Sequence, residues 1–207
     1  MNLQIKNIKH FYNGNCFIQY NDFSIQLGIM LVHGTSGSGK TTLLHSIYRI
    51  KNYSGIILWN DTNIAEIPID YYYKNIVSIV FQGGITSHHF TITDYFTLFK
   101  QSGSNDKNQE LLQQLELNAL TKQPIEHLSG GQKYKTAILI AILKNTPIIL
   151  LDEPTAHLDS QSTHTIISIL ENLAKNKIIL IATHDNELLK KKELNHYFIQ
   201  RNALPNH

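Results

Sequence analysis

The feature that most constrains the fold is a glycine-rich stretch placed between a short apolar run and an amphipathic segment. The apolar run covers residues 29–32, and residues 43–50 carry apolar side chains at helical spacing. The stretch itself fits the pattern G-x-x-x-x-G-K-[ST] of a phosphate-binding loop and consists of Gly34, Thr35, Ser36, Gly37, Ser38, Gly39, Lys40, Thr41 and Thr42. Strand, glycine-rich turn and helix in this order predict a nucleotide-binding site.

Each residue type in this loop has a physical task. Glycines let backbone N–H groups converge on phosphate oxygens without a Cβ in the way. A helix beginning near Lys40 directs the positive end of its dipole at the same oxygens. Lys40 is expected to reach the β and γ phosphates, and the Thr41 hydroxyl to ligate Mg²⁺. A flexible linker that happens to contain lysine is the alternative, and the flanking strand and helix disfavour it.

Composition limits the remaining possibilities. The 207 residues fit one sizeable α/β domain, and a net charge of +2 supplies no basic surface for nucleic acid. Eleven histidines are scattered without metal-binding spacing, and the single Cys16 excludes an intramolecular disulfide and suits a reducing cytosol. The longest apolar run, residues 137–143, is seven residues long, whereas a membrane-spanning helix needs about 20. We therefore expect no membrane span.

The order of apolar segments predicts an α/β protein with a mainly parallel sheet. Half-exposed strands are expected in residues 3–27, with a turn around residues 13–15, and another strand is expected at residues 55–59. Buried strands are expected at residues 76–81, 148–151, 177–182 and 197–199, and helices at residues 93–100, 107–117, 132–144 and 160–175. We interpret residues 1–207 as one domain whose core is interrupted by a helical insertion at about residues 83–145.

A pair of acidic residues follows one of the buried strands. Asp152 and Glu153 come directly after the apolar run 148–151, and ligands of open α/β sheets bind at this end of the strands. Beside a phosphate-binding loop, such an aspartate holds Mg²⁺, usually through water, and the glutamate can act as general base. The alternative is a strand that ends in ordinary polar residues, which the upstream phosphate-binding loop makes less attractive.

Residues 128–132, which we call the signature motif, read Leu-Ser-Gly-Gly-Gln and precede a predicted helix. Ser129 suits the N-cap, so the motif is a second helix start that can bind an anion. With this motif the sequence resembles the ATP-binding cassette (ABC) ATPases, whose L-S-G-G-Q stands before the P-x-x-x-L-D-E strand. Three further motifs of that family are matched in order. The Q-loop is matched by Gln82, the D-loop by residues 156–159, and the switch histidine by residues 183–185.

The resemblance implies a role for each matching residue. Thr41 and Gln82 would ligate Mg²⁺ with Asp152 in its outer shell, Glu153 would be the general base, and His184 would contact the γ-phosphate. Tyr12 would stack on adenine, with its neighbour Phe11 as the alternative. The nucleotide-binding set would comprise Tyr12, residues 34–42, Ser129, Gly130, Gly131, Gln132 and Asp159. Lys135 and Ile140 stand where the family has arginines, so the guanidinium fork is lost at both.

The family also implies partners. Ser129 and Gly131 would contact ATP held by a second copy, in a head-to-tail dimer that closes on two ATP molecules. A separately encoded membrane subunit would hold the chain at the inner face of the cell membrane. Its short helix would enter a groove with an apolar floor, Phe90, Ile92, Tyr95 and Phe96; packing of these residues within the insertion is the alternative. The N-terminal strands would form an antiparallel β subdomain.

Two functions remain open from the sequence. The first is a Mg²⁺-dependent ATPase that powers an ABC transporter. The second is a soluble relative acting on nucleic acid or the ribosome, but such members carry a long coiled coil or two cassettes. Here Gln82 and Leu128 are only 46 positions apart, the chain has one phosphate-binding loop, and its charge is near neutral. The transporter ATPase is the preferred interpretation.

Overall fold

The computed structural model describes residues 1–12, 15–85, 89–99, 105–156 and 158–199. Its strands are β1 Leu3–Tyr12, β2 Asn15–Gln19, β3 Phe23–Ile25, β4 Gly28–His33, β5 Ser54–Trp59, β6 Thr62–Asn63, β7 Val77–Val80, β8 Ile148–Asp152, β9 Ile178–Ala182 and β10 Asn195–Phe198. Its α-helices are α1 Lys40–Ile47, α2 Ile69–Asn75, α3 Ile92–Leu98, α4 Asp106–Gln114, α5 Gly130–Leu143, α6 Ser160–Ala174 and α7 Asn186–Leu189.

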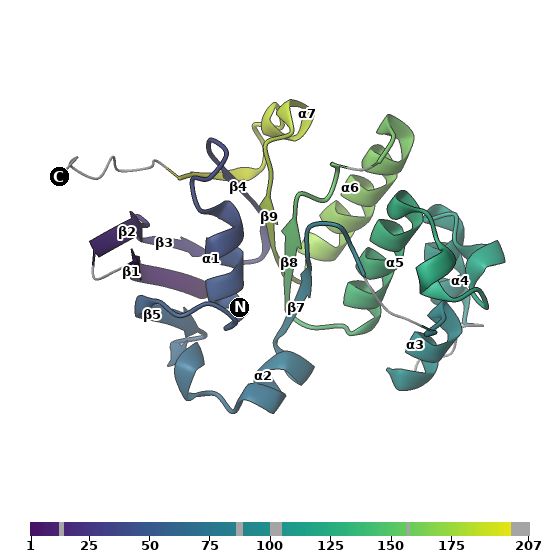
Figure 1. Cartoon of the computed structure of the whole chain (residues 1–207), viewed down its shortest axis with the longest axis horizontal. Coiled ribbons are helices and arrows are strands. Elements are labelled where there is room, and N and C mark those ends of the chain that lie inside the picture. Colours follow the sequence, from purple (N-terminus) through teal and green to yellow (C-terminus); the bar gives the residue numbers. More distant parts are fainter. Residues whose placement is uncertain (13–14, 86–88, 100–104, 157, 200–207) are drawn as a thin grey trace.

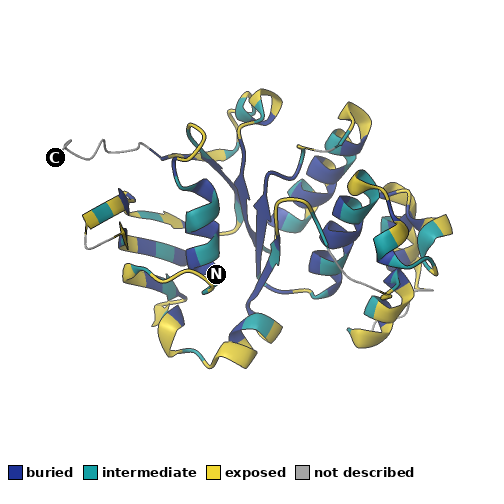
Figure 2. Ribbon diagram, viewed as in Figure 1, coloured by how far each residue is buried: buried dark blue, intermediate teal, exposed yellow. Residues whose placement is uncertain are grey.

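A parallel sheet forms the centre of the molecule (Figure 1). Its strand order is β10-β4-β9-β8-β7, and every pairing between neighbours is parallel. Strands β8 and β9 are buried along their whole length, and Figure 2 shows the dark blue of buried residues running through the sheet. Burial on both faces explains why these strands read as continuous apolar runs. The predicted α/β class with a mainly parallel sheet is confirmed.

The side chains of the parallel strands alternate between two hydrophobic clusters. Successive residues of a strand point to opposite faces of the sheet. Thus Ile149 and Ile179 pack with α5 and α6, whereas Ile148 and Ile178 pack with α1 and the N-terminal strands. Helix α1 therefore covers one face of the sheet, and α5 and α6 cover the other, as Figure 1 shows.

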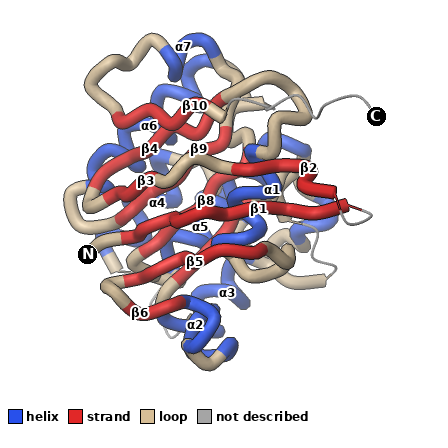
Figure 3. Tube along the Cα trace, turned by 90° about the vertical axis from the view of Figure 1, so that its left-hand side faces the viewer, coloured by secondary structure: helices blue, strands red, loops and turns tan. Residues whose placement is uncertain are grey.

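An antiparallel sheet of the N-terminal strands packs on the far side of α1. Strand β1 pairs antiparallel with β2, β3 and β5, and β5 pairs with β6; these strands face the viewer in Figure 3. The β1–β2 register shifts between His10 and Phe11, which marks a bulge near the end of β1. The predicted antiparallel N-terminal part is confirmed, while residues 13–14 of the predicted turn lie outside the described residues.

Helix α2 and the predicted groove floor differ from the sequence prediction. Helix α2 was not predicted; it presents Tyr72, which is fully buried, while Tyr71 beside it is exposed. The expectation of an apolar groove floor is wrong for Ile92 and Phe96, because both are buried in the hydrophobic cluster of α5 and α6. Phe90 remains exposed. Among the described helices, none is long and apolar enough to cross a membrane.

Candidate functional site

Neighbouring strands of the parallel sheet bring the predicted site residues to one edge. The phosphate-binding loop follows β4, Asp152 ends β8, and Glu153 comes next. His184 lies two residues beyond β9, and Gln82 lies two residues beyond β7. Because all these strands are parallel, their carboxyl ends share one edge of the sheet, where ligands of such folds bind.

Hydrogen bonds from Lys40 within the phosphate-binding loop and from Tyr20 outside it hold the loop in shape. The Lys40 ammonium donates to the carbonyl oxygens of Gly34 and Thr35 at 3.0 and 3.4 Å. Gly39 caps α1 with φ 107°, a backbone conformation that favours glycine. The buried Tyr20 hydroxyl donates to the Gly39 carbonyl at 2.9 Å, and a Cβ on Gly39 would lie 2.8 Å from that hydroxyl. The loop is thus shaped before any phosphate enters.

Thr41 and Asp152 form a pair suited to a divalent cation. The Thr41 hydroxyl donates to Asp152 Oδ1 at 3.2 Å across 111 positions of sequence. Asp152 is 1% exposed, and within the described part of the chain its Oδ2 is buried without a hydrogen-bond partner. Burial raises the pKa of Asp152, and the Thr41 hydrogen bond opposes that rise. A hard cation prefers oxygen ligands, so the orphaned carboxylate oxygen fits Mg²⁺.

Glu153 and His184 form the second pair. Glu153 Oε1 lies 2.7 Å from His184 Nδ1, and Glu153 Oε2 accepts from the His184 backbone N–H at 3.3 Å. The Glu153 side chain is largely buried, whereas the His184 side chain is mostly exposed. Glu153 has φ 50°, a left-handed conformation that is uncommon for residues other than glycine. A carboxylate held this way can accept a proton from water, and an exposed imidazole can reach a ligand.

Gln82, predicted as a further Mg²⁺ ligand, lies on the chain beyond the end of β7. Its side chain is exposed, and in the described residues no hydrogen bond joins it to Thr41 or Asp152. Gly83 and Gly84 follow with φ 90° and 79°, so the chain turns sharply after Gln82. The predicted role of Gln82 as a metal ligand stays a prediction.

The signature motif lies at the start of α5. Ser129 is the N-cap: its hydroxyl accepts from the Gln132 N–H at 3.3 Å, and the Gln132 side chain accepts from the Ser129 N–H at 2.9 Å. This capping box orders the first turn, which contains Gly130 and Gly131. Because α5 and α1 cover opposite faces of the parallel sheet, the signature motif and the phosphate-binding loop belong to different layers.

Tyr12 and Asp159, which were also predicted to bind nucleotide, lie at the end of β1 and at the start of α6. Tyr12 ends β1 and is 71% exposed, and its neighbour Phe11 is 57% exposed, so both aromatic rings are accessible. Asp159 caps α6 and accepts from the Ser162 N–H and hydroxyl, bonds that lower its pKa. Position 157 of the predicted D-loop lies outside the described residues.

Two tyrosines that contact this edge were not predicted. Tyr20 donates to the phosphate-binding loop, as described above, and the buried Tyr134 hydroxyl donates to the Asp152 carbonyl at 3.1 Å. Neither belongs to a recognisable motif. The only signal in the sequence is position, because Tyr134 lies two residues after the signature motif.

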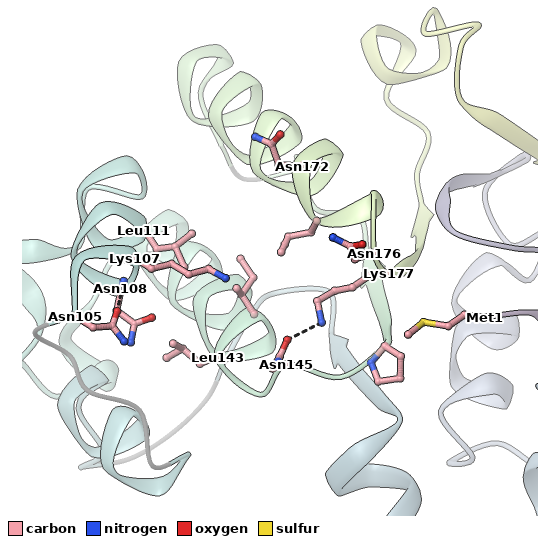
Figure 4. Close-up of a pocket in the computed structure, with 13 residues that line it drawn as sticks. Met1, Asn105, Lys107, Asn108, Leu111, Leu143, Asn145, Asn172, Asn176 and Lys177 are labelled. Atoms are coloured by element: carbon pink, nitrogen blue, oxygen red, sulfur yellow. Dashed lines mark hydrogen bonds between the residues drawn. The ribbon is translucent and has the colours of Figure 1, made fainter.

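A hollow without any of the predicted site residues lies elsewhere in the molecule (Figure 4). It measures about 740 Å³ and is lined by the start of α4, the ends of α5 and α6 and the residues before β9. There the Lys177 ammonium donates to Asn145 Oδ1 at 2.9 Å. These residues lie at the amino ends of the parallel strands, and none of the predicted site residues lines the hollow. Its size does not make it the nucleotide site.

The fold and the paired side chains at the sheet edge define a phosphate-loop ATPase. Residues 20–156 match the family model described as ABC transporter, and the chain belongs to this family. YclH of Bacillus subtilis (strain 168), named an uncharacterized ABC transporter ATP-binding protein, is 29% identical over 206 residues, covering 93% of this chain and 91% of its own. HrtA of Staphylococcus saprophyticus, provisionally named a hemin import ATP-binding protein, is 33% identical over 212 residues, covering 92% and 93%.

Solved structures agree on the fold. A dimeric ATP-binding cassette in a post-hydrolysis state with ADP and Pi has a TM-score of 0.80 at 23% identity, covering 96% of this chain and 97% of its own. A bacterial Atm1-family ABC exporter with ATP bound has a TM-score of 0.82 at 20% identity, covering 99% of this chain and 38% of its own. The family model and the curated relatives confirm the predicted family membership, and the chain is an ATP-hydrolysing, nucleotide-binding subunit of an ABC transporter.

Proposed function

We propose that the chain hydrolyses Mg²⁺-bound ATP at the edge formed by β4, β9, β8 and β7. In this proposal residues 34–42 hold the triphosphate, Thr41 and Asp152 hold Mg²⁺, and Glu153 activates the attacking water. His184 orients Glu153 and contacts the γ-phosphate. The single observation that carries the proposal is the meeting of two pairs, Thr41 with Asp152 and Glu153 with His184, at one edge of the sheet.

Mg²⁺ supplies charge neutralisation on the phosphate oxygens when it is bound. The protein contributes the other parts of catalysis. Burial and the main-chain bond to His184 fix the Glu153 carboxylate, which takes the proton of the water as it attacks phosphorus. Lys40 can exchange its two loop carbonyls for phosphate oxygens, because the ammonium already lies over the loop.

The arrangement of layers supports a dimer of two copies. Ser129 and the signature glycines begin α5, which covers the sheet face opposite α1. A head-to-tail pair would let the signature motif of one copy approach ATP in the other. ATP would then be shared between the two chains and its hydrolysis would open the pair. The residues for this role are Ser129, Gly130, Gly131, Gln132 and Asp159.

A membrane subunit is the partner we propose for the accessible side of the helical insertion. Phe90 is exposed, and Tyr95 is partly exposed with its ring centroid 5.8 Å from that of Phe90. A hollow of about 690 Å³ lies nearby, between α2 and the end of α3, with Tyr73, Leu98 and Phe99 in its lining. Aromatic and apolar side chains at such a hollow suit a short helix of the membrane subunit. The chain would then work at the cytoplasmic face of the membrane.

Glu153→Gln tests the proposed chemistry. The amide keeps the size of the side chain but cannot take a proton, so turnover should fall by about 10²-fold or more while ATP still binds. The variant should elute as a dimer from a sizing column with ATP and as a monomer without it. Glu66→Gln, a change at an exposed glutamate outside the site, is the control and should keep wild-type turnover. Wild-type turnover in Glu153→Gln would assign the base to another group.

A further inference from the structure

Tyr134 connects α5, the helix that begins at the signature motif, to the end of β8, where Asp152 and Glu153 lie. Its side chain is 1% exposed and packs in the hydrophobic cluster of α5 and α6. Its hydroxyl donates to the main-chain carbonyl of Asp152 at 3.1 Å. Burial, with the charges of Asp152 and Glu153 beside it, raises the pKa of Tyr134.

This hydrogen bond falls on the peptide unit between the two carboxylates. The Asp152 carbonyl and the Glu153 N–H are opposite ends of one planar peptide unit. Tyr134 of α5 holds the carbonyl end, and the carbonyl of Ala182 in β9 accepts from the N–H end at 2.9 Å. A hydrogen bond therefore holds each end of this peptide plane. The orientation of the plane determines the direction in which each carboxylate side chain leaves the backbone.

These two hydrogen bonds act at a strained position of the backbone. Glu153 has φ 50°, and a non-glycine residue persists in this strained region only when its surroundings hold it. Without the Tyr134 hydroxyl, the peptide plane would keep one of its two hydrogen bonds and could rotate toward a more relaxed conformation. Glu153 would then spend less time at the position where it meets His184.

The chain after Gln82 rests on the same turn of α5. A Cβ on Gly84 would lie 3.1 Å from both the nitrogen and the Cα of Tyr134, closer than side chains normally approach. Gly84 also has φ 79°, so both its conformation and its contact require glycine. The same turn of α5 thus makes two contacts. Its backbone lies against the segment after Gln82, and the Tyr134 hydroxyl donates to the end of β8.

We infer that Tyr134 is a positioning residue for ATP hydrolysis, which orients the Asp152–Glu153 peptide and couples it to the signature helix. The inference rests on the proposed role of Glu153 as the base. Because the Tyr134 side chain is buried and its hydroxyl donates to the Asp152 carbonyl, we expect it to act through the main chain between the two carboxylates. Its contribution should therefore show in the turnover of bound ATP rather than in ATP affinity.

The test compares two tyrosines that make the same kind of hydrogen bond. Tyr72 is also fully buried, and its hydroxyl donates to the Ile47 carbonyl at 2.6 Å, at the far end of α1 from the phosphate-binding loop. Tyr134→Phe and Tyr72→Phe each keep the ring and lose one hydroxyl. Both should lower the melting temperature by a similar amount, which makes Tyr72→Phe the matched control for a purely structural effect.

Steady-state ATPase kinetics and nucleotide titration are measured for wild type and both variants, well below the melting temperatures. Tyr134→Phe should lower kcat about fivefold to tenfold, with KM and nucleotide affinity within about twofold of wild type. Such a pattern indicates an interaction needed in the transition state but not for binding. Tyr72→Phe should keep kcat within about twofold.

An unchanged kcat in Tyr134→Phe, or an equal loss of kcat in both variants, would overturn the inference. A rise in KM without a change in kcat would also overturn it, because it would place the effect on binding. Failure of the proposed function gives a different result, namely wild-type turnover in Glu153→Gln. The two proposals can therefore fail separately.

Discussion

Asp152→Asn should stabilise the nucleotide-free protein and yet abolish most of its response to Mg²⁺. The carboxylate is buried, Oδ1 accepts one hydrogen bond from Thr41, and Oδ2 has no partner among the described residues. Burial raises the pKa of Asp152 in the folded state above its unfolded value. The charged form therefore destabilises the fold, and this penalty grows as the pH rises from the unfolded pKa through the folded pKa. Above that range it is fully present.

The magnitude follows from the unpaired oxygen. A buried acceptor without a partner costs about 1–3 kcal/mol. Asparagine removes the charge but leaves an amide N–H₂ in the same place, so we expect a net gain of about 1 kcal/mol. For a chain of this length that gain raises the melting temperature by about 2–4 °C. A magnesium nucleotide at about 100 times its Kd adds about 2.7 kcal/mol to wild type, which is more than the variant gains.

The order of stability should therefore reverse with the ligand. Melting temperatures are measured at pH 7.5 with a non-hydrolysable ATP analogue, in Mg²⁺ and in EDTA. Without ligand, Asp152→Asn should melt above wild type; with the magnesium nucleotide, wild type should melt above the variant. Asp70→Asn, at an exposed position of α2, should follow wild type in both conditions. If Asp152→Asn gains as much from the magnesium nucleotide as wild type does, the Mg²⁺ assignment is wrong.

Two further predictions concern the support of the phosphate-binding loop and the partner. Tyr20→Phe removes the hydrogen bond to the Gly39 carbonyl, so the Kd for ATP in a fluorescent-nucleotide titration should rise about threefold to tenfold; Tyr72→Phe, which loses a similar bond at the far end of α1 from the loop, should leave it unchanged. Tyr95→Asp should abolish retention of the chain in membrane fractions of its source cells while ATP still binds. Thr97→Asp, at an exposed position of α3, should be retained like wild type, and equal retention of both variants would contradict the docking proposal.

The sequence predicted the layered core well because burial leaves a clear pattern. Runs of apolar residues at 148–151 and 177–182 became strands buried on both faces, and their bounds differ from β8 and β9 by one residue. Helix α2 was missed for the opposite reason. Residues 69–75 bury a single side chain, Tyr72, and contain three tyrosines and an asparagine of modest helix propensity, so no apolar periodicity marks them. Helix α4 ended earlier than predicted, and Glu116 beyond it has φ 57°.

Candidate site residues were predictable where a local motif carries the chemistry. The pattern around Lys40 and the acid pair after β8 can be recognised in a few consecutive residues. Tyr20 and Tyr134 could not be found this way, because each hydroxyl reaches a carbonyl 19 or 18 positions away. Their contacts depend on how the layers pack, and a tyrosine that will donate to a distant carbonyl looks in the sequence like any other tyrosine.

The order of strands explains how His184 comes to lie beside Glu153. Strand β9 stands between β4 and β8, so it is the one strand hydrogen-bonded to both the strand before the phosphate-binding loop and the strand before the carboxylates. At its carboxyl end the Thr183 N–H donates to Val32, and the Ala182 carbonyl accepts from Glu153. A shift of β9 along either neighbour would therefore disturb both halves of the site at once. The position of His184 is fixed by β4 and β8, the strands on either side of β9, and not by residues close to it in the sequence.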